Sequence, residues 1–293
     1  MSLASVTRTA PHVRAARNSE RLQLWFLIAS LPAAGAGLWL QPEALGPFGL
    51  RLMAVWLTGA AWELWFSRLR QRPMDIAWLV QGWLLALLVP VDVPLPLVAV
   101  AMSFGMVIGH HVFGGAGRSP VNPALLGALF LQFGYPEVAA SAGLGSASWL
   151  ACAVGGACLV WVGAASIRVP LGIVIGVMVT ATLQNLNTGL ADHPDGWRPP
   201  DGMTHLLMGQ LMFCSAFIAT DPGSAALTRV ARWLHGLLLG TLTVLLRVLD
   251  PTHPDGVLYA TLLAGLTVPL LDHVAVRRAI RAVAALATRD GAT

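Results

Sequence analysis

Two adjacent histidines begin a polar segment, HHVFGGAGRSPVNPALLG at residues 110–127, which lies between two long apolar runs. Imidazole groups titrate near neutral pH, so His110 or His111 could donate a proton at a membrane surface. Adjacent residues on a regular α-helix point about 100° apart, so the two rings are not expected to hold one metal ion. The pair therefore favours proton transfer or an interfacial polar cap, and no metal site is predicted.

The same segment continues with a glycine-rich turn and a helix start. Gly114 and Gly115 permit backbone conformations that other residues resist, and Arg118 adds a guanidinium group. Asn122 followed by a proline matches an N-cap with proline at the first helical position. Such a helix start directs free backbone N–H groups and the positive end of the helix dipole toward the turn. A ligand with a carbonyl or phosphate group could dock there.

A second polar break is FIATDPGSAALTR at residues 217–229. Thr220 and Asp221 end an apolar run, and a short new helix is predicted near Ser224. Asp221 either caps that helix or faces a ligand. Both breaks fall on the side of the chain that carries most arginines, so we expect them to meet.

A third candidate is Glu63 in GAAWELWFSRLR, about one turn from the end of its apolar run. Ionisable residues at membrane depth are costly and are therefore functional candidates. Glu63 either extends toward Arg68 or Arg70 at the membrane surface, or helps to bind an ion or a quinone.

Positioning these groups requires a membrane-embedded helical scaffold. The 293 residues are 56% hydrophobic and 11% charged, whereas soluble domains carry about a quarter charged residues, so a large water-soluble domain is excluded. The alternation of a membrane β-barrel is absent. We predict an all-α polytopic membrane protein with about ten transmembrane helices at 22–40, 49–67, 76–90, 95–112, 122–135, 147–165, 169–186, 204–219, 232–249 and 257–276. The third and fifth are short, so each is tilted, or discontinuous and covered by protein.

The basic residues indicate the orientation of this scaffold. Alternating the loops between two sides places fifteen of the eighteen basic residues, all arginines, on the side of both termini. The positive-inside rule then predicts cytoplasmic termini in a bacterial inner membrane. The expected divisions are a polar cytoplasmic arm at 1–21, a transmembrane domain at 22–276 and a cytoplasmic tail at 277–293. Two inverted sets of five helices with discontinuous members are one possible arrangement.

Pairs of small residues four positions apart indicate where helices pack closely. Gly172 and Gly176 form one such pair, and Gly236 and Gly240 form another. The three cysteines lie in apolar segments without CxxC spacing, so neither a disulfide framework nor a zinc site is predicted from them.

Four ordered blocks resemble the NqrB/RnfD family of membrane subunits in sodium-translocating NADH:quinone reductases and Rnf complexes. They are GAAWELWFSRLR, SFGMVIGHHVFGGAGRSPVNPALLG, FIATDPGSAALT and RVLDPTHPDGVLYATLLAGLTVPLLDH. The resemblance implies ten transmembrane helices, a multisubunit electron-transfer complex, and flavin or quinone chemistry that can be coupled to Na⁺ or H⁺ movement. It also implies that Gly59 and Glu63 lie near a quinone or ion site, and that Asn122 matches an asparagine near the family's non-covalent riboflavin.

The chain departs from the family pattern at several places, among them Ala60, which stands where a second glycine is common. The segment that carries the family's S-G-A-T motif, whose threonine bears FMN, is missing between the fifth and sixth predicted helices, so covalent FMN is not expected. Ser119 stands where the family often has asparagine, and His110 and His111 replace a lysine-containing pair.

The sequence therefore predicts a non-autonomous subunit of a quinone-reductase-type complex that holds quinone, with non-covalent riboflavin or FMN as a further candidate. The expected partners are other membrane and peripheral subunits and the lipid bilayer, and no nucleic acid. Two alternatives remain open: a channel or transporter for a small solute or ion, and a non-redox scaffold subunit. No catalytic residue and no metal ligand is predicted, and the predicted cofactor-binding residues are Gly59, Glu63, His110, Gly114, Gly115, Arg118, Asn122, Thr220, Asp221 and Ser224.

Overall fold

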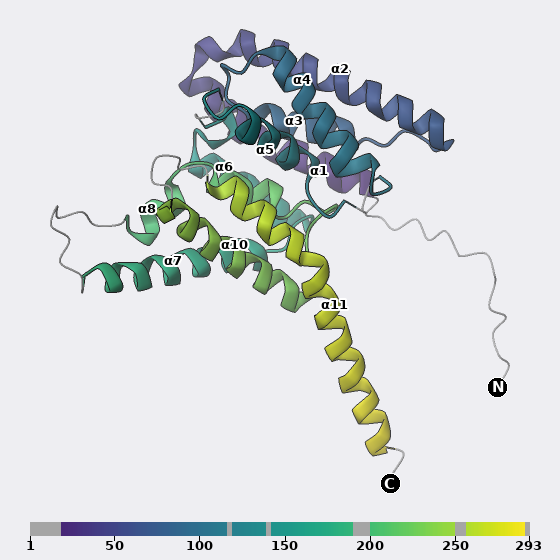
Figure 1. Ribbon diagram of the computed structural model, residues 1–293, viewed down its shortest axis with the longest axis vertical. Coiled ribbons are helices and arrows are strands. Elements are labelled where there is room, and N and C mark those ends of the chain that lie inside the picture. Colours follow the sequence, from purple (N-terminus) through teal and green to yellow (C-terminus); the bar gives the residue numbers. More distant parts are fainter. Residues whose placement is uncertain (1–18, 116–118, 139–141, 190–199, 250–255, 291–293) are drawn as a thin grey trace.

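A computed structural model describes residues 19–115, 119–138, 142–189, 200–249 and 256–290, with backbone alone at 187–189 and 282–290 (Figure 1). Arg118 lies outside the described residues. The described chain is helical and contains no strand. Its α-helices are α1 (Ser19–Leu40), α2 (Leu45–Arg70), α3 (Ala77–Leu88), α4 (Leu95–Phe104), α5 (Pro123–Gly134), α6 (Trp149–Val162), α7 (Arg168–Gly189), α8 (Gly202–Leu207), α9 (Leu211–Phe213), α10 (Arg229–Leu249) and α11 (Gly256–Asp290).

Short 3₁₀-helices and π-helices lie between these α-helices or continue them. Short 3₁₀ turns are η1 (Pro42–Ala44) and η3 (Leu144–Ser146), and π-helices are η2 (Gly105–His111) and η4 (Cys214–Ile218). Among the described residues, five helices are long and apolar enough to cross a membrane, and four shorter apolar helices accompany them. The predicted all-α polytopic membrane fold is confirmed.

Three of the predicted helices differ in detail from the structure, and the first of these, at 95–112, is divided into α4 and the π-helix η2. The predicted helix at 204–219 is divided into α8, α9 and η4, and Gly209, with a left-handed φ of 63°, lies in the break between α8 and α9. The predicted helix at 257–276 continues as α11 to Asp290. Figure 1 shows this helix extending beyond the rest of the molecule to the C-terminal end.

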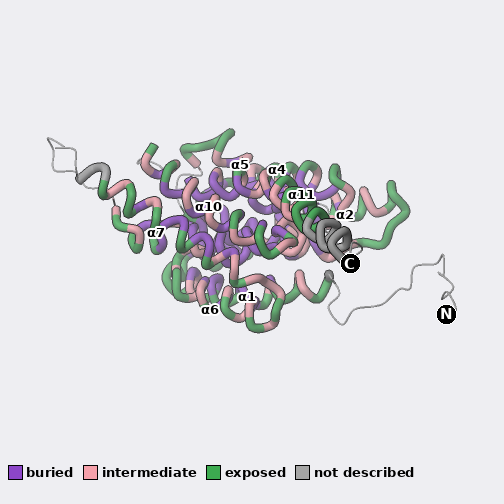
Figure 2. Tube along the Cα trace, turned by 90° about the horizontal axis from the view of Figure 1, so that it is seen from below, coloured by how far each residue is buried: buried purple, intermediate pink, exposed green. Residues whose placement is uncertain are grey.

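The short helices α3 and α5 are covered by protein, as one of the two sequence interpretations predicted. Each has 12 residues and therefore spans about 18 Å of a hydrocarbon core of about 30 Å. All residues of α3 from Val80 to Leu88 are buried. Figure 2 shows buried segments through the middle of the molecule and exposed ones along its outer surface.

Side chains from other elements pair with the ends of these short helices. The side chain of Arg51 donates to the carbonyl oxygen of Val89 at 2.6 Å, and that of Gln210 donates to Leu88 at 3.1 Å. At the start of α5, the backbone N–H of Ala124 donates to Gln81 Oε1 at 3.3 Å. Backbone groups at membrane depth have no water to bond, so these side chains make the interrupted helices possible.

Each half of the chain contributes one buried glutamine that bonds to the end of a short helix of the first half. In the first half, Gln81 lies in α3, eleven residues before Asp92; in the second half, Gln210 precedes α9, eleven residues before Asp221. Both glutamines are buried, and each bonds to the end of a short helix. Figure 1 shows α1 to α5 largely on one side of the molecule and α7, α8, α10 and α11 on the other.

Helices α7 and α10 pack at the predicted small-residue pairs. A Cβ atom added to Gly176 would lie 2.5 Å from the carbonyl oxygen of Leu237, and one added to Gly240 would contact the carbonyl oxygen of Ile173. The backbones therefore approach as closely as glycine allows, which is how helices associate where no hydrophobic effect acts between them.

Gly240→Val is expected to lower the amount of folded protein in membranes several-fold, because its side chain would force α7 and α10 apart. The expected cost is about 1–3 kcal/mol or more, as for other overpacked sites. Detergent-solubilised protein that elutes as a single species would be quantified against the unchanged chain. Gly35→Val in α1 is the matched control, since an added Cβ there meets no atom within 4 Å. Equal yields of the two variants would contradict this packing.

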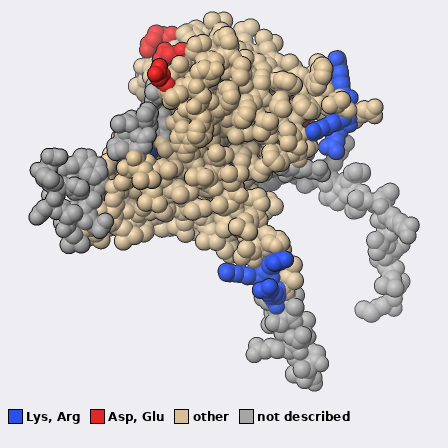
Figure 3. Space-filling view, in the orientation of Figure 1, with Lys and Arg blue, Asp and Glu red and all other residues tan. Residues whose placement is uncertain are grey.

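Charged side chains separate toward the ends of the helices. On the face shown in Figure 3, basic residues form two separate groups, one at the right edge and one near the lower end, while acidic residues gather at the upper left corner. One group lies at and just after the end of α2 (Arg68, Arg70 and Arg72), and the other lies in the C-terminal half of α11 (Arg277, Arg278 and Arg281); all six residues are exposed. We call the group at the end of α2 the arginine-rich end.

Candidate cofactor site at the arginine-rich end

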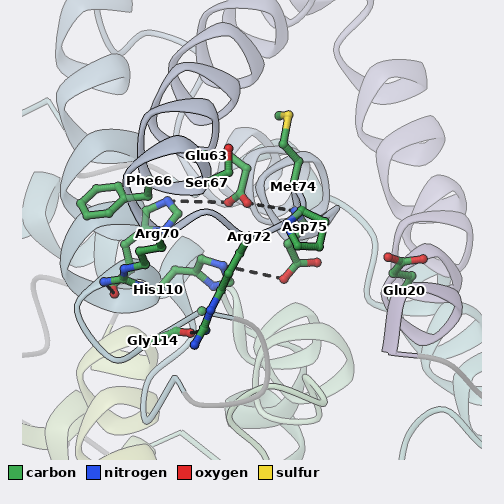
Figure 4. A pocket seen from close by; sticks show the side chains of 13 residues that line it. Glu20, Glu63, Phe66, Ser67, Arg70, Arg72, Met74, Asp75, His110 and Gly114 are labelled. Atoms are coloured by element: carbon green, nitrogen blue, oxygen red, sulfur yellow. Dashed lines mark hydrogen bonds and ion pairs between the residues drawn. The ribbon is translucent and has the colours of Figure 1, made fainter. Parts of the chain in front are cut away.

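A cavity of about 340 Å³ opens where α2 ends (Figure 4). Its walls come from the first turn of α1, the last two turns of α2, the connection to α3, and η2 with the turn that follows. The volume lies at the lower end of the range of small-molecule sites, about 300–1,000 Å³. The residues that line it are Glu20, Glu63, Phe66, Ser67, Arg70, Arg72, Pro73, Met74, Asp75, His110, His111, Gly114 and Gly115.

Glu63 is the buried acid of this cavity, with 5% of the residue exposed. Its Oε1 atom accepts a hydrogen bond of 2.9 Å from the backbone N–H of Asp75, which ties α2 to the segment before α3. Its Oε2 atom has no hydrogen-bond partner among the described residues and lies 3.7 Å from His111 Nε2. One carboxylate oxygen is therefore structural, and the other faces the imidazole.

Both histidines face the cavity. The residues are 3% exposed, and their rings meet edge to face with centroids 5.1 Å apart. His110 Nε2 lies 3.9 Å from Asp75 Oδ2. The expectation that two adjacent rings diverge is wrong here, because the chain is π-helical from Gly105 to His111 and leaves the helix directly afterwards. A π-helix has more residues per turn, so the angle between adjacent side chains is smaller.

An aromatic and cationic wall completes the cavity. The Phe66 ring stacks on His111 with centroids 4.2 Å apart and an angle of 14° between their planes. The Arg70 guanidinium lies 5.2 Å from the centre of the Phe66 ring, and its Nη2 atom donates to the carbonyl oxygen of His111 at 2.6 Å. This stacking gives the cavity a flat face beside a fixed positive charge.

The predicted glycine turn is present at the rim. Gly114 and Gly115 have φ angles of 105° and 95°, which other residues adopt only with strain. Their N–H groups donate to the carbonyl oxygens of His111 and His110 at 3.1 and 3.0 Å. The turn thus closes the end of η2 and fixes both histidines.

The two polar breaks meet, as the sequence predicted, in a buried cluster separate from this cavity. Asn122 caps α5, its Oδ1 accepting from the N–H of Leu125 at 3.1 Å. Burial raises the pKa of Asp221 to about 6, although the amides of Asn122 and Gln81 and the hydroxyl of Ser224 lower it. The free space beside Asn122 and Ser224 is about 10 Å³, too small for a ring.

The predicted site residues therefore fall into separate groups. Glu63, His110, Gly114 and Gly115 line the cavity, whereas Asn122, Asp221 and Ser224 belong to the closed cluster. The helix predicted near Ser224 is absent from the described residues, because turns occupy 222–224 and α10 begins at Arg229.

Two further predicted residues have local packing roles. The Thr220 hydroxyl donates to the carbonyl oxygen of Ala216 at 2.5 Å. Gly59 lies one turn before Glu63, where an added Cβ would be 2.7 Å from the terminal methyl of Met102. Its small size allows α2 to approach α4, and it does not line the cavity.

Several residues that line the cavity were not among the predicted site residues. Phe66, Ser67 and Arg70 lie three, four and seven positions after Glu63, so helical spacing places all of them on the same face and could have identified them. No helical spacing could have identified Asp75, because it lies in an irregular connection. The hydrogen bond from its backbone N–H to Glu63 positions that connection.

Comparisons with known proteins identify relatives along nearly the whole chain. Residues 6–142 and 138–281 match the model of the NQR2, RnfD, RnfE family. One subunit of the Na(+)-translocating NADH-quinone reductase of Azotobacter vinelandii is 30% identical, with 95% of this chain and 89% of the relative covered. The corresponding protein of Pseudomonas aeruginosa is 33% identical, with 78% and 67% covered. The two matched ranges meet at 138–142, within the stretch from which the S-G-A-T motif is missing.

Proposed function

Since the chain belongs to the NQR2, RnfD, RnfE family, we propose that it is a membrane subunit of a quinone-reductase-type electron-transport complex and that the cavity binds a quinone headgroup. The observation that carries the proposal is the combination, in one cavity of about 340 Å³, of a flat aromatic wall, a guanidinium and buried proton-carrying groups. The relatives' name, NADH-quinone reductase, agrees with this chemistry. Other subunits of the complex supply the electrons.

The cavity offers a quinone ring the contacts it needs. The rings of Phe66 and His111 both line the cavity and are the aromatic groups against which a quinone ring would pack. Arg70 uses one N–H group on a backbone carbonyl and retains others that can donate to a quinone oxygen. These contacts orient the ring so that its oxygens face the buried acid and imidazoles.

Reduction of a quinone to a hydroquinone requires two electrons and two protons. Glu63 and His111 lie 3.7 Å apart and can each carry a proton, so they would form a short path from the mouth of the cavity to a ring oxygen. Asp75, with its side chain 21% exposed and 3.9 Å from His110, connects this path to solvent. The protons that reduce the quinone would therefore come from the solvent that the mouth of the cavity faces.

The proposed orientation places the cavity at the cytoplasmic face of a bacterial inner membrane, with both chain termini on the same side. The exposed arginines at the end of α2, beside the cavity, and those in the C-terminal half of α11 support it through the positive-inside rule. Protons used at the site would then come from the cytoplasm. Coupling to Na⁺ or H⁺ movement would require the rest of the complex.

A non-covalent flavin is the weaker cofactor proposal. The resemblance associates riboflavin with Asn122, but the space beside this residue is about 10 Å³. A flavin there would require α5 and the segment after η4 to separate. The cavity beside Glu63 is the better candidate for a ring-shaped ligand.

Photolabelling would test the quinone site directly. The native complex, isolated through a tag on this chain, would be illuminated with an azidoquinone and digested for mass spectrometry. We expect label within residues 63–75 or 110–115, suppressed by excess unlabelled quinone. Competed label confined to other segments or other subunits would overturn the assignment.

A further inference from the structure

We propose that Glu63, His110 and His111 form a binding site for a divalent transition-metal cation of the zinc class. One ligand atom from each residue can be chosen so that all three lie within 4.8 Å of one another. Two imidazole nitrogens and one carboxylate oxygen are a ligand set that zinc uses in proteins, with a fourth position left for water or another ligand. Here the fourth position would face the cavity.

The burial of unpartnered atoms is an independent reason to expect a ligand. The side chains of Glu63 and His111 are 6% and 4% exposed. Glu63 Oε2 and His111 Nε2 have no hydrogen-bond partner within the described chain. Buried polar atoms in native proteins are nearly always paired, and leaving two of them unpaired is costly. A cation bound between them would satisfy both.

The distances fit a cation after small side-chain movements. Zinc bonds of about 2.0–2.1 Å in a tetrahedron place neighbouring ligand atoms about 3.3 Å apart. Glu63 Oε2 and His111 Nε2 are 3.7 Å apart, so this pair needs to close by a few tenths of an ångström. His110 requires a larger side-chain adjustment, within the 4.8 Å limit of the group.

Neighbouring groups hold the ligands in place. The N–H of Asp75 occupies Glu63 Oε1, which leaves Oε2 for the cation. The Asp75 carboxylate lies beside His110, as carboxylates do beside metal-binding imidazoles. The positive charge of Arg70 would repel a bound cation. Its Nη2 atom is directed to the His111 carbonyl oxygen, and the negative charges of the Glu63 and Asp75 carboxylates offset the charge of the guanidinium.

The ligand types select the class of cation. Mg²⁺ and Ca²⁺ prefer oxygen ligands throughout, whereas imidazole suits zinc, cobalt, nickel, copper and iron. The binding site stands on its own observations and does not depend on the proposed quinone reaction. It revises the expectation of no metal, which rested on divergent histidine rings.

Cobalt binding to the full chain in lipid nanodiscs tests the proposal. The protein would be purified through a tag without histidine and titrated with Co²⁺, whose visible absorption is intense in tetrahedral sites. We expect one Co²⁺ per chain with such a spectrum, displaced by Zn²⁺. Glu63→Gln and His111→Gln should each weaken binding at least about tenfold, because each removes a ligand. His273→Gln, at an exposed histidine of α11, is the matched control and should bind as the unchanged chain does.

A substitution that retains a ligand separates coordination from a structural role. In His111→Cys, a thiolate should bind Co²⁺ and add a sulfur-to-cobalt charge-transfer band in the near ultraviolet. The absence of that band in folded His111→Cys would overturn the proposal. The proposal would also be overturned if the unchanged chain did not bind Co²⁺. It would be overturned equally if Glu63→Gln and His111→Gln bound Co²⁺ as strongly as the unchanged chain. No readout here is electron transfer, so failure would leave the quinone photolabelling result unaffected.

Discussion

Glu63→Gln is expected to lower quinone-dependent turnover of the complex by on the order of 10²-fold, the usual contribution of a general acid or base. Glutamine has the same shape and its Oε1 atom can still accept from the N–H of Asp75, so the connection between α2 and α3 should persist. Its amide cannot deliver a proton. The turnover number should therefore fall far more than the KM for quinone rises.

The measurement is steady-state reduction of a short-chain quinone by the isolated complex, with the electron donor that supports the unchanged complex and with a metal chelator present. The chelator separates proton delivery from cation binding at the same residue. Glu43→Gln replaces an exposed glutamate of η1 and should leave turnover unchanged. Turnover of Glu63→Gln within twofold of the unchanged complex, at equal subunit content, would rule out Glu63 as the proton carrier.

Arg247→Met is expected to reduce folded protein in membranes more than any surface substitution. Arg247 is 5% exposed, and its guanidinium donates to the carbonyl oxygens of His205 at 2.5 Å and Met208 at 2.7 Å. These two hydrogen bonds satisfy carbonyl groups at the C-terminal end of α8, just before the break in the helix at Gly209. Methionine fills similar space but leaves two carbonyl groups without these bonds, at a cost of about 1–3 kcal/mol for each unsatisfied group.

Membrane yield and thermal aggregation of the solubilised protein would measure this loss. Arg277→Met, at an exposed arginine of α11, is the matched control and should have little effect. Replacing a buried charge by an apolar group can also stabilise a protein when its partners become apolar, but the carbonyl groups here stay polar. A normal yield and an unchanged aggregation temperature for Arg247→Met would show that α8 does not depend on this arginine.

The cation and the quinone are expected to compete, because both use Glu63 and His111. If the proposed quinone site is correct, Zn²⁺ should inhibit turnover and chelation should restore it. Inhibition that persists unchanged in folded His111→Gln would place the inhibitory Zn²⁺ at another site of the complex. This experiment connects the two proposals after each has been tested separately.

Much of the scaffold could be predicted from local sequence. Whether about twenty consecutive residues can lie in hydrocarbon depends on their own side chains, so the helices followed from the apolar runs, and the side that carries most arginines followed from the positions of the arginines between those runs. The packing of Gly172 and Gly176 against Gly236 and Gly240 followed from residue size and helical spacing. The Asn122 cap followed from the preferences of a helix start.

What the local pattern could not predict was which polar groups share a cavity. Regular helical geometry separates adjacent side chains, but the π-helix ending at His111 directs both histidines inward, and hydrophobic periodicity contains no signal for that change. Asp75 reaches the site through a backbone bond to Glu63, twelve residues earlier. Asn122 and Asp221, by contrast, fill a closed cluster because the protein around them leaves no space. Membrane insertion is thus a property of each segment alone, whereas the convergence of an acid, two imidazoles and a guanidinium is a property of segments packed together in space.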